Sequence, residues 1–200
     1  MSKTQEINID TENDLPKRKI PDDLYNLSVF NYQSDWKTWR GFWKNLVYFF
    51  KCLRPAYHRA TKGYCRMDTW NADSTITTYL IKVLTEYRNV TNGYPGNEDF
   101  PTFESWIAYI DEIIDLLVYC EKETDQMNDY YHDWEKECCD TPRSEWTDRQ
   151  RFIYEHYLAE NQTLYEAQKA AREKAFAMLG KHLNHIWWEG KLLTTFMFLF

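Results

Sequence analysis

Glycine and proline are scarce in this chain: each occurs six times in 200 residues, too rarely for the many turns of an all-β domain. Disorder is excluded by composition, because apolar residues make up 44% of the chain and aromatic residues 18%. Long apolar runs are also missing, and the mean hydropathy of −0.71 is too low for a protein with several membrane spans. A helical domain that folds in water is what remains.

Signatures of the common enzyme classes are absent as well. The sequence contains no Walker loop, no Gly-x-Gly-x-x-Gly segment and no Gly-x-Ser-x-Gly elbow, so it does not support a nucleotide-binding or serine-nucleophile enzyme. We predict no catalytic residue, no cofactor and no bound metal. The five cysteines are scattered and contain no Cys-x-x-Cys pair, a pattern that favours reduced thiols over a zinc site. They are Cys52, Cys65, Cys120, Cys138 and Cys139.

One histidine pair has the spacing of metal ligands. His182, His185 and Glu189 would share one face of a helix, an arrangement compatible with zinc or iron. Because no partner ligand can be identified on a second helix, we interpret the histidines as interfacial residues beside Trp187 and Trp188.

The two ends of the chain differ from its middle. Residues 1–33 show no sustained hydrophobic period and are predicted to form a flexible or loosely docked arm. The first 23 residues lack the apolar core of a signal peptide, which predicts a cytoplasmic protein. Residues 191–200 are almost all apolar but are half as long as the roughly 20 residues of a membrane span. This tail is expected to pack on the domain, to dock on a partner or to lie at a membrane surface.

Apolar residues at three- and four-residue spacing predict an all-α bundle of about four or five helices in a single domain, residues 34–200. The first helix is predicted to begin at Ser34 and Asp35 and to end at Pro55. A second follows Asp73, and Thr102 caps a third that either continues beyond Thr124 or breaks there. The last helix is expected to start at Ser144 or Thr147.

Charge is distributed unevenly. Residues 37–66 contain eight basic residues and no acidic one, whereas residues 121–148 contain ten carboxylates and three basic residues. The acidic segment either imitates a nucleic-acid backbone or forms an ordinary solvated helix face.

The basic region also carries aromatic residues, a combination that neutralises phosphates and stacks on bases. Its candidate ligand-binding residues are Arg40, Trp43, Lys44, Arg66 and Trp70. The same pattern suits a helix that lies at a membrane surface. Alternatively, the aromatic residues belong to the core, Trp70 included, and the basic face pairs with residues 121–148.

Four carboxylates form an alternative site. Asp111 and Asp115 lie one turn apart on one predicted helix, and Asp68 and Asp73 lie at the start of the preceding one, so an antiparallel pair would gather all four for magnesium-dependent phosphate chemistry. The competing interpretation is structural: Asp68 or Asp73 caps its helix, and Asp111 accepts a hydrogen bond from the turn at residues 94–96.

Several of these residues recur in a recognisable order. The chain contains Gly63-Tyr64, Asp68-x-Trp70-x-x-Asp73, Tyr94-Pro95-Gly96, Phe103-x-x-Trp106 and Asp111-Glu112-Ile113-Ile114. In this order and spacing, residues 35–120 resemble a family of bacteriophage and prophage proteins. The resemblance implies a phage gene product in the cytoplasm of a bacterial host, and it implies no particular chemistry.

Taken together, these patterns predict a non-enzymatic phage accessory protein that acts by binding. Its expected partner is a host or anti-phage defence protein, a nucleic acid or a nucleotide signal. The chain itself is expected to lack a transmembrane span, and its exposed aromatic surface is compatible with a homo-oligomer. The alternatives are a metal-dependent phosphohydrolase that uses the carboxylate cluster and a structural protein of the phage particle.

Overall fold

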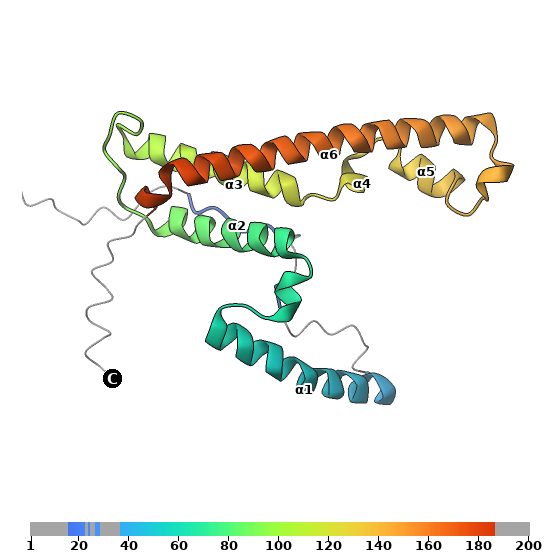
Figure 1. Ribbon diagram of the computed structural model, residues 1–200, viewed down its shortest axis with the longest axis horizontal. Helices are drawn as coiled ribbons and strands as arrows, with labels where there is room; N and C mark the ends of the chain where they lie inside the picture. Colours follow the sequence, from blue (N-terminus) through green and yellow to red (C-terminus); the bar gives the residue numbers. More distant parts are fainter. Residues whose placement is uncertain (1–15, 23, 25–26, 29–36, 187–200) are drawn as a thin grey trace, which may run out of the picture.

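The helical patterns of the sequence are realised throughout the computed structural model, which describes residues 16–22, 24, 27–28 and 37–186 (Figure 1). These residues form α-helices and short 3₁₀ helices and contain no strand, so the all-α prediction is confirmed. The α-helices are α1 (Trp39–Lys62), α2 (Ala72–Val90), α3 (Phe103–Glu121), α4 (Thr124–Met127), α5 (Tyr131–Glu137) and α6 (Asp148–His182). The 3₁₀ helices are η1 (Arg66–Thr69), η2 (Arg143–Glu145) and η3 (Leu183–His185).

Helix α3 supplies most of the hydrophobic core. It packs against both α2 and α6, and its apolar residues are spaced so that they face these two neighbours. The fully or almost fully buried ones are Trp106, Ile110, Ile113, Ile114 and Leu117. Burial of each such side chain contributes about 1.5–3 kcal/mol to folding. Thr102 caps the helix as predicted, since its Oγ1 accepts a hydrogen bond from Ser105 N at 3.2 Å.

The 35 residues of α6 span about 52 Å at 1.5 Å per residue. One end packs on α3, and the other supports α4 and α5. Asn128 donates hydrogen bonds from Nδ2 to Tyr157 O and to Asn161 Oδ1, both at 2.9 Å. The Trp134 ring stacks on Tyr157 with 4.8 Å between centroids. The acidic segment therefore forms two short helices and η2, all folded back along α6.

The structure decides two boundaries for which the sequence left two alternatives each. The chain breaks after Glu121 and resumes as α4 at Thr124, so the third helix does not continue into the acidic segment. Thr147, and not Ser144, caps α6, because its Oγ1 accepts a hydrogen bond from Gln150 N at 3.3 Å.

The predicted limits of the first helix are wrong. Ser34 and Asp35 lie outside the described residues, and the observed cap is Thr38, whose Oγ1 accepts a hydrogen bond from Gly41 N at 3.1 Å. Pro55 lies inside α1. Proline removes one backbone hydrogen bond, and the carbonyl that it frees belongs to Lys51, an exposed residue.

Glycine supplies the true end of α1. Gly63 adopts a left-handed backbone conformation with φ of 79°, which glycine adopts at little cost. Its N–H donates a hydrogen bond to Arg59 O at 3.0 Å.

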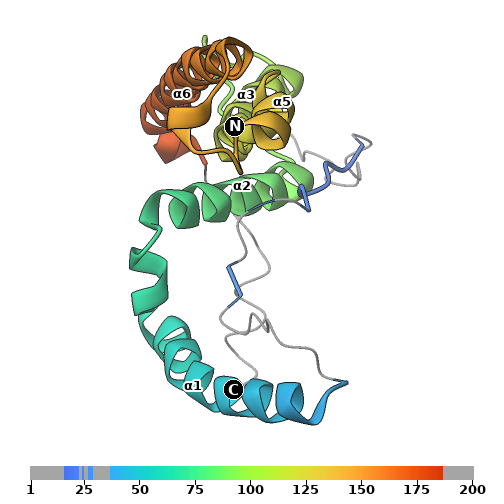
Figure 2. The ribbon, with the colours of Figure 1, turned by 90° about the vertical axis from the view of Figure 1, so that its right-hand side faces the viewer.

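Helix α1 lies apart from the other helices. In Figure 2, α1 and α2 are the two arms of a C that are joined through η1. The corner is fixed by Asp68, which forms an ion pair with Arg59 and accepts a hydrogen bond from Cys65 N at 2.7 Å. Burial alone would raise the pKa of Asp68, but the hydrogen bonds from Arg59 and Cys65 outweigh burial and lower it.

At the far end of the bundle, the His182 ring is buried and lies edge-on to Phe100 and Tyr109, with centroid separations of 4.8 and 5.3 Å. His185 Nδ1 is 3.4 Å from His182 Nδ1, and Glu189 lies outside the described residues. No group of three metal-ligating side chains occurs in the described part of the chain. Packing against Phe100 and Tyr109 accounts for the position of His182, while Trp187 and Trp188, the neighbours expected from the sequence, lie outside the described residues.

The stability of the protein is expected to fall with pH below about 6.5, the ordinary histidine pKa. Burial lowers the pKa of His182 and the Lys181 charge lowers it further, while Asp99, 3.7 Å from Nε2, opposes the shift. The folded protein thus favours the neutral ring, so this contribution is complete above the ordinary pKa and is lost as pH falls through the lowered one. Urea midpoints near pH 7.5 and 5.5 test this. His182→Gln, which cannot titrate, should lose less stability between these two values; an equal loss would contradict the assignment.

Candidate binding surface

A row of large apolar side chains runs along the exposed side of α1. Its members are spaced three or four residues apart and therefore lie on one helix face. We call this row the aromatic stripe. It consists of Trp39, Trp43, Val47, Phe50, Leu53 and Tyr57, whose exposed fractions range from 44% to 76%. Trp39 and Trp43 contact each other edge to face, with 5.4 Å between ring centroids.

The stripe points away from the side of α1 that is covered. The buried residues of this helix are Gly41, Asn45 and Cys52. At 100° per residue, their mean direction is roughly opposite that of the stripe. The aromatic residues of α1 are thus not core residues, which corrects that interpretation of the sequence.

Basic residues line one edge of the stripe. We call Arg40, Lys44, Lys51 and Arg54 the basic edge; α1 contains no acidic residue. A hollow of about 610 Å³ lies where the stripe meets this edge. Among the described residues it is lined by Trp39, Arg40, Trp43, Lys44, Val47, Tyr48 and Lys51. No ion pair joins α1 to residues 121–148, both of which the structure describes in full, so the predicted pairing of these two segments is wrong.

The five predicted ligand-binding residues are partly brought together. Arg40, Trp43 and Lys44 line the same hollow. Arg66 belongs to a second hollow of about 270 Å³, between η1 and the middle of α1. Trp70 follows η1 and is 93% exposed, so it is not the core residue that the structural alternative assumed.

The stripe extends further than the sequence predicted. Phe50 and Leu53 continue the spacing of Trp39 and Trp43 inside the predicted helix, and Tyr57 continues it beyond the predicted end. The signal was present in the sequence, but the assumption that Pro55 ends the helix removed Tyr57 from the pattern.

A third hollow, of about 470 Å³, lies inside the corner between α1, η1 and α2. Its wall is mainly apolar, with Ile76, Tyr79 and Leu80 from α2, and with the Arg59–Asp68 ion pair at one side. Arg59 also donates a hydrogen bond to Leu27 O. The arginine therefore links three segments, and we assign it to the architecture of the corner.

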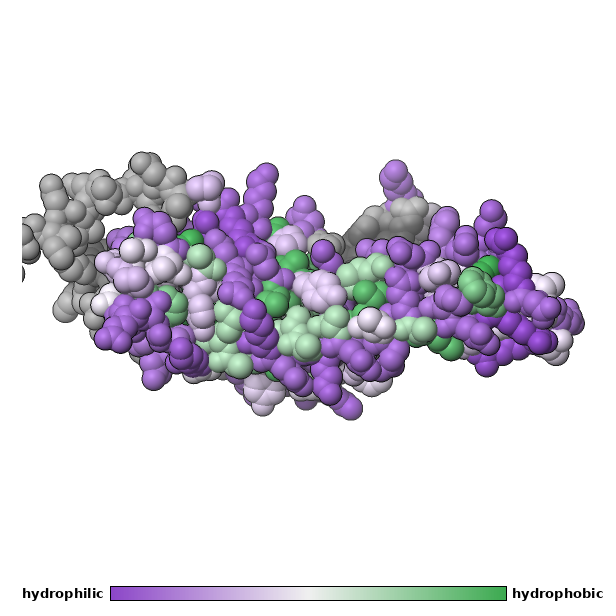
Figure 3. Space-filling model, turned by 90° about the horizontal axis from the view of Figure 1, so that it is seen from above, coloured by the Kyte–Doolittle hydropathy of each residue, from purple (hydrophilic) through white to green (hydrophobic). Residues whose placement is uncertain are grey.

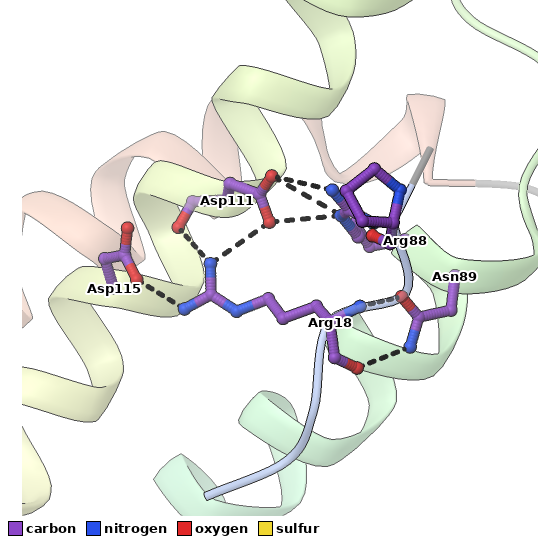
Figure 4. A network of polar contacts seen from close by, with 6 residues as sticks. Arg18, Arg88, Asn89, Asp111 and Asp115 are labelled. Carbon is purple, nitrogen blue, oxygen red and sulfur yellow. Dashed lines mark hydrogen bonds and ion pairs between the residues drawn. The ribbon is translucent and has the colours of Figure 1, made fainter. Parts of the chain in front are cut away.

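The four candidate metal-binding carboxylates do not meet. Asp111 accepts hydrogen bonds from Arg88 Nε at 3.2 Å and from Arg18 Nη1 at 3.1 Å, and Asp115 forms an ion pair with Arg18 (Figure 4). Asp73 lies 3.7 Å from Arg172. Since arginines occupy these carboxylates and no metal-ligating group of three exists among residues that the structure describes, the predicted cluster is not assembled.

The same network tests the structural interpretation of Asp111, in which this carboxylate accepts a hydrogen bond from the turn at residues 94–96. Its partners are arginines and not the turn at residues 94–96, so that expectation is also wrong. Arg18 belongs to the segment predicted as a flexible or loosely docked arm, and its backbone N and O both bond to the Asn89 side chain at 2.8 Å. Residues 16–22 are therefore docked on α2 and α3, while residues 1–15 lie outside the described part.

In the view over α6, hydrophilic side chains cover most of the face, and apolar side chains lie among them along its middle (Figure 3). On the acidic segment, Glu137 receives two hydrogen bonds from Arg149, at 2.9 and 2.8 Å. These bonds lower the pKa of Glu137.

Comparison with known proteins assigns no function to this surface, so its role is inferred from its residues alone. No family model, no curated protein and no solved structure matches the chain. Within the described residues, no helix is long and apolar enough to cross a membrane.

Proposed function

We propose that this chain acts by binding, and that the aromatic stripe and basic edge of α1 are its binding surface. One observation carries the proposal: six large apolar side chains lie exposed in a row on a helix without acidic residues. Exposing such a row to water is unfavourable, and a contiguous apolar surface of this kind is typical of interaction sites.

The charges on α1 favour an anionic partner. Arg40, Lys44, Lys51 and Arg54 lie beside the stripe, and no carboxylate of α1 offsets them. A nucleic acid, an acidic face of a host or defence protein, or another anionic surface would supply the opposite charge. Pairing of Asp111, Asp115 and Asp73 with arginines favours binding over the alternative of a phosphohydrolase. Resemblance to the phage family supports an accessory role in an infected bacterium.

This proposal predicts that retention of a partner depends on α1. Tagged full-length protein would be incubated with a whole bacterial lysate that still contains its membranes, with and without nuclease, and retained protein, nucleic acid and lipid phosphorus would be measured. The triple variant Trp39→Ser, Trp43→Ser and Phe50→Ser should lose most of the retained material, because it removes three of the six side chains of the stripe.

A matched control removes three apolar side chains of similar exposure from α6: Phe152→Ser, Leu158→Ser and Tyr165→Ser. This control variant should retain the same material as the unchanged protein. Equal retention by both triple variants would contradict the proposal, provided that circular dichroism shows the same helix content for each.

A further inference from the structure

We propose that the partner of α1 is an anionic lipid membrane, with the helix lying along its surface and the aromatic stripe inserted among the headgroups. The inference rests on the proposed function and specifies the partner of the same surface.

The composition of the stripe favours lipid over nucleic acid. Aromatic rings stack on bases, but the aliphatic side chains of Val47 and Leu53 have no such role, and they are 52% and 44% exposed within the same row. Acyl chains accept aliphatic and aromatic groups alike. Trp39, the most exposed member at 76%, is of the residue type that is enriched at the interface of membrane and water.

The geometry suits a flat surface. From Trp39 to Tyr57 the stripe extends for about 27 Å at 1.5 Å per residue, long enough for the helix to lie parallel to the membrane. Because the buried residues Gly41, Asn45 and Cys52 lie on the opposite side of α1, insertion would not disturb them. The bundle lies beyond the corner at η1, so α1 can approach a membrane without it.

The basic edge supplies the second requirement of an interfacial helix. Lysine and arginine have long aliphatic stems, which allow the cations to reach headgroup phosphates while the stem contacts apolar groups. The hollow of about 610 Å³ has Trp39, Trp43 and Val47 on its apolar side and Arg40, Lys44 and Lys51 on its basic side. An anionic headgroup at this boundary would contact both kinds of side chain.

A second copy of this helix fits less well. Two stripes packed face to face would leave both basic edges without a carboxylate from either α1. In the antiparallel arrangement the two edges would also lie side by side, and like charges at close distance oppose association. The lipid surface satisfies the apolar and the charged part of α1 at the same time.

The test is sedimentation of full-length protein with vesicles of phosphatidylcholine alone or with about one third phosphatidylglycerol. Because apolar insertion and charge act together, we expect at least about tenfold stronger binding to the anionic vesicles. Both the triple stripe variant and a charge variant, Lys44→Gln, Lys51→Gln and Arg54→Gln, should lose about tenfold or more. The α6 triple variant serves as the control and should bind like the unchanged protein.

A second measurement locates the stripe and does not depend on the serine variants remaining folded. Vesicles with brominated acyl chains should quench tryptophan fluorescence, and Trp39→Phe with Trp43→Phe should reduce the quenching while binding is largely kept. Undiminished quenching would overturn the inference.

The vesicle experiment separates this inference from the proposed function. Absence of vesicle binding overturns the lipid inference, whether the protein instead binds a single-stranded oligonucleotide or forms a dimer through α1. If the lysate experiment still shows retention that depends on the stripe, the proposed function stands. If neither vesicles nor lysate components are retained through α1, both proposals fail.

Discussion

Replacing Trp106 by alanine is expected to lower the free energy of unfolding by about 3–5 kcal/mol, the usual cost of removing a buried aromatic side chain. Trp106 is fully buried and packs against Phe100 with 4.8 Å between ring centroids. Its indole N–H also donates a hydrogen bond to Tyr87 Oη at 3.2 Å. Urea unfolding followed by far-ultraviolet circular dichroism would measure the loss without depending on tryptophan fluorescence.

Trp70→Ala is the matched control. The same side chain is removed from a position that is 93% exposed, so the free energy of unfolding should change by no more than about 0.5 kcal/mol. Similar losses for Trp106→Ala and Trp70→Ala would show that the two tryptophans have not been assigned correctly to core and surface.

Replacing Asp111 by alanine is expected to cost about 3 kcal/mol. The side chain of Arg88 is 9% exposed, and removing the partner of a buried ion pair leaves a charge in a poorly solvated position. The same change frees Arg18 Nη1 and so weakens the docking of residues 16–22. Urea midpoints would measure the first effect, and the rate of tryptic cleavage at Lys17, Arg18 and Lys19 would measure the second.

Asp115→Ala separates the two partners of Arg18. The Asp115 side chain is 70% exposed, and exposed ion pairs contribute at most about 1 kcal/mol. We expect a small change in urea midpoint for this variant. If Asp115→Ala were as destabilising as Asp111→Ala, the buried position of Arg88 would not be the source of the effect.

The parts of the fold that sequence patterns predicted are those governed by neighbouring residues. The three- and four-residue spacing of apolar residues in α3 places Trp106, Ile110 and Leu117 on one helix face, and the structure buries that face. Thr102 and Thr147 were recognisable as caps since a threonine hydroxyl bonds to a backbone N–H three residues later. Helix faces and helix caps depend on residues that are only three or four positions apart.

Contacts between residues far apart in the sequence could not be predicted in this way. Arg18 and Asp111 are separated by 93 positions, and nothing near either one identifies the other. The same applies to Asp73 and Arg172. The carboxylates therefore looked available for a metal, because the arginines that neutralise them come from other segments.

The candidate surface was predictable in composition but not in exposure. Arg40, Trp43 and Lys44 were recognised as a basic aromatic group from their spacing alone. An amphipathic pattern, however, is the same whether the apolar face packs on a neighbour or remains open. Only the position of α1 beyond the corner at η1 distinguishes these two cases.

The separation of α1 from the bundle also divides the molecule energetically. Because α3 packs on both α2 and α6 whereas α1 packs on none of them, we expect the three bundle helices to unfold as one cooperative unit and the amide hydrogens of α1 to exchange with solvent through a local opening that leaves this core intact. A ligand of α1 would therefore slow amide hydrogen exchange in that helix but raise the melting temperature of the α2, α3 and α6 core only slightly. The binding element can thus respond to a partner while the rest of the molecule keeps its structure and its stability.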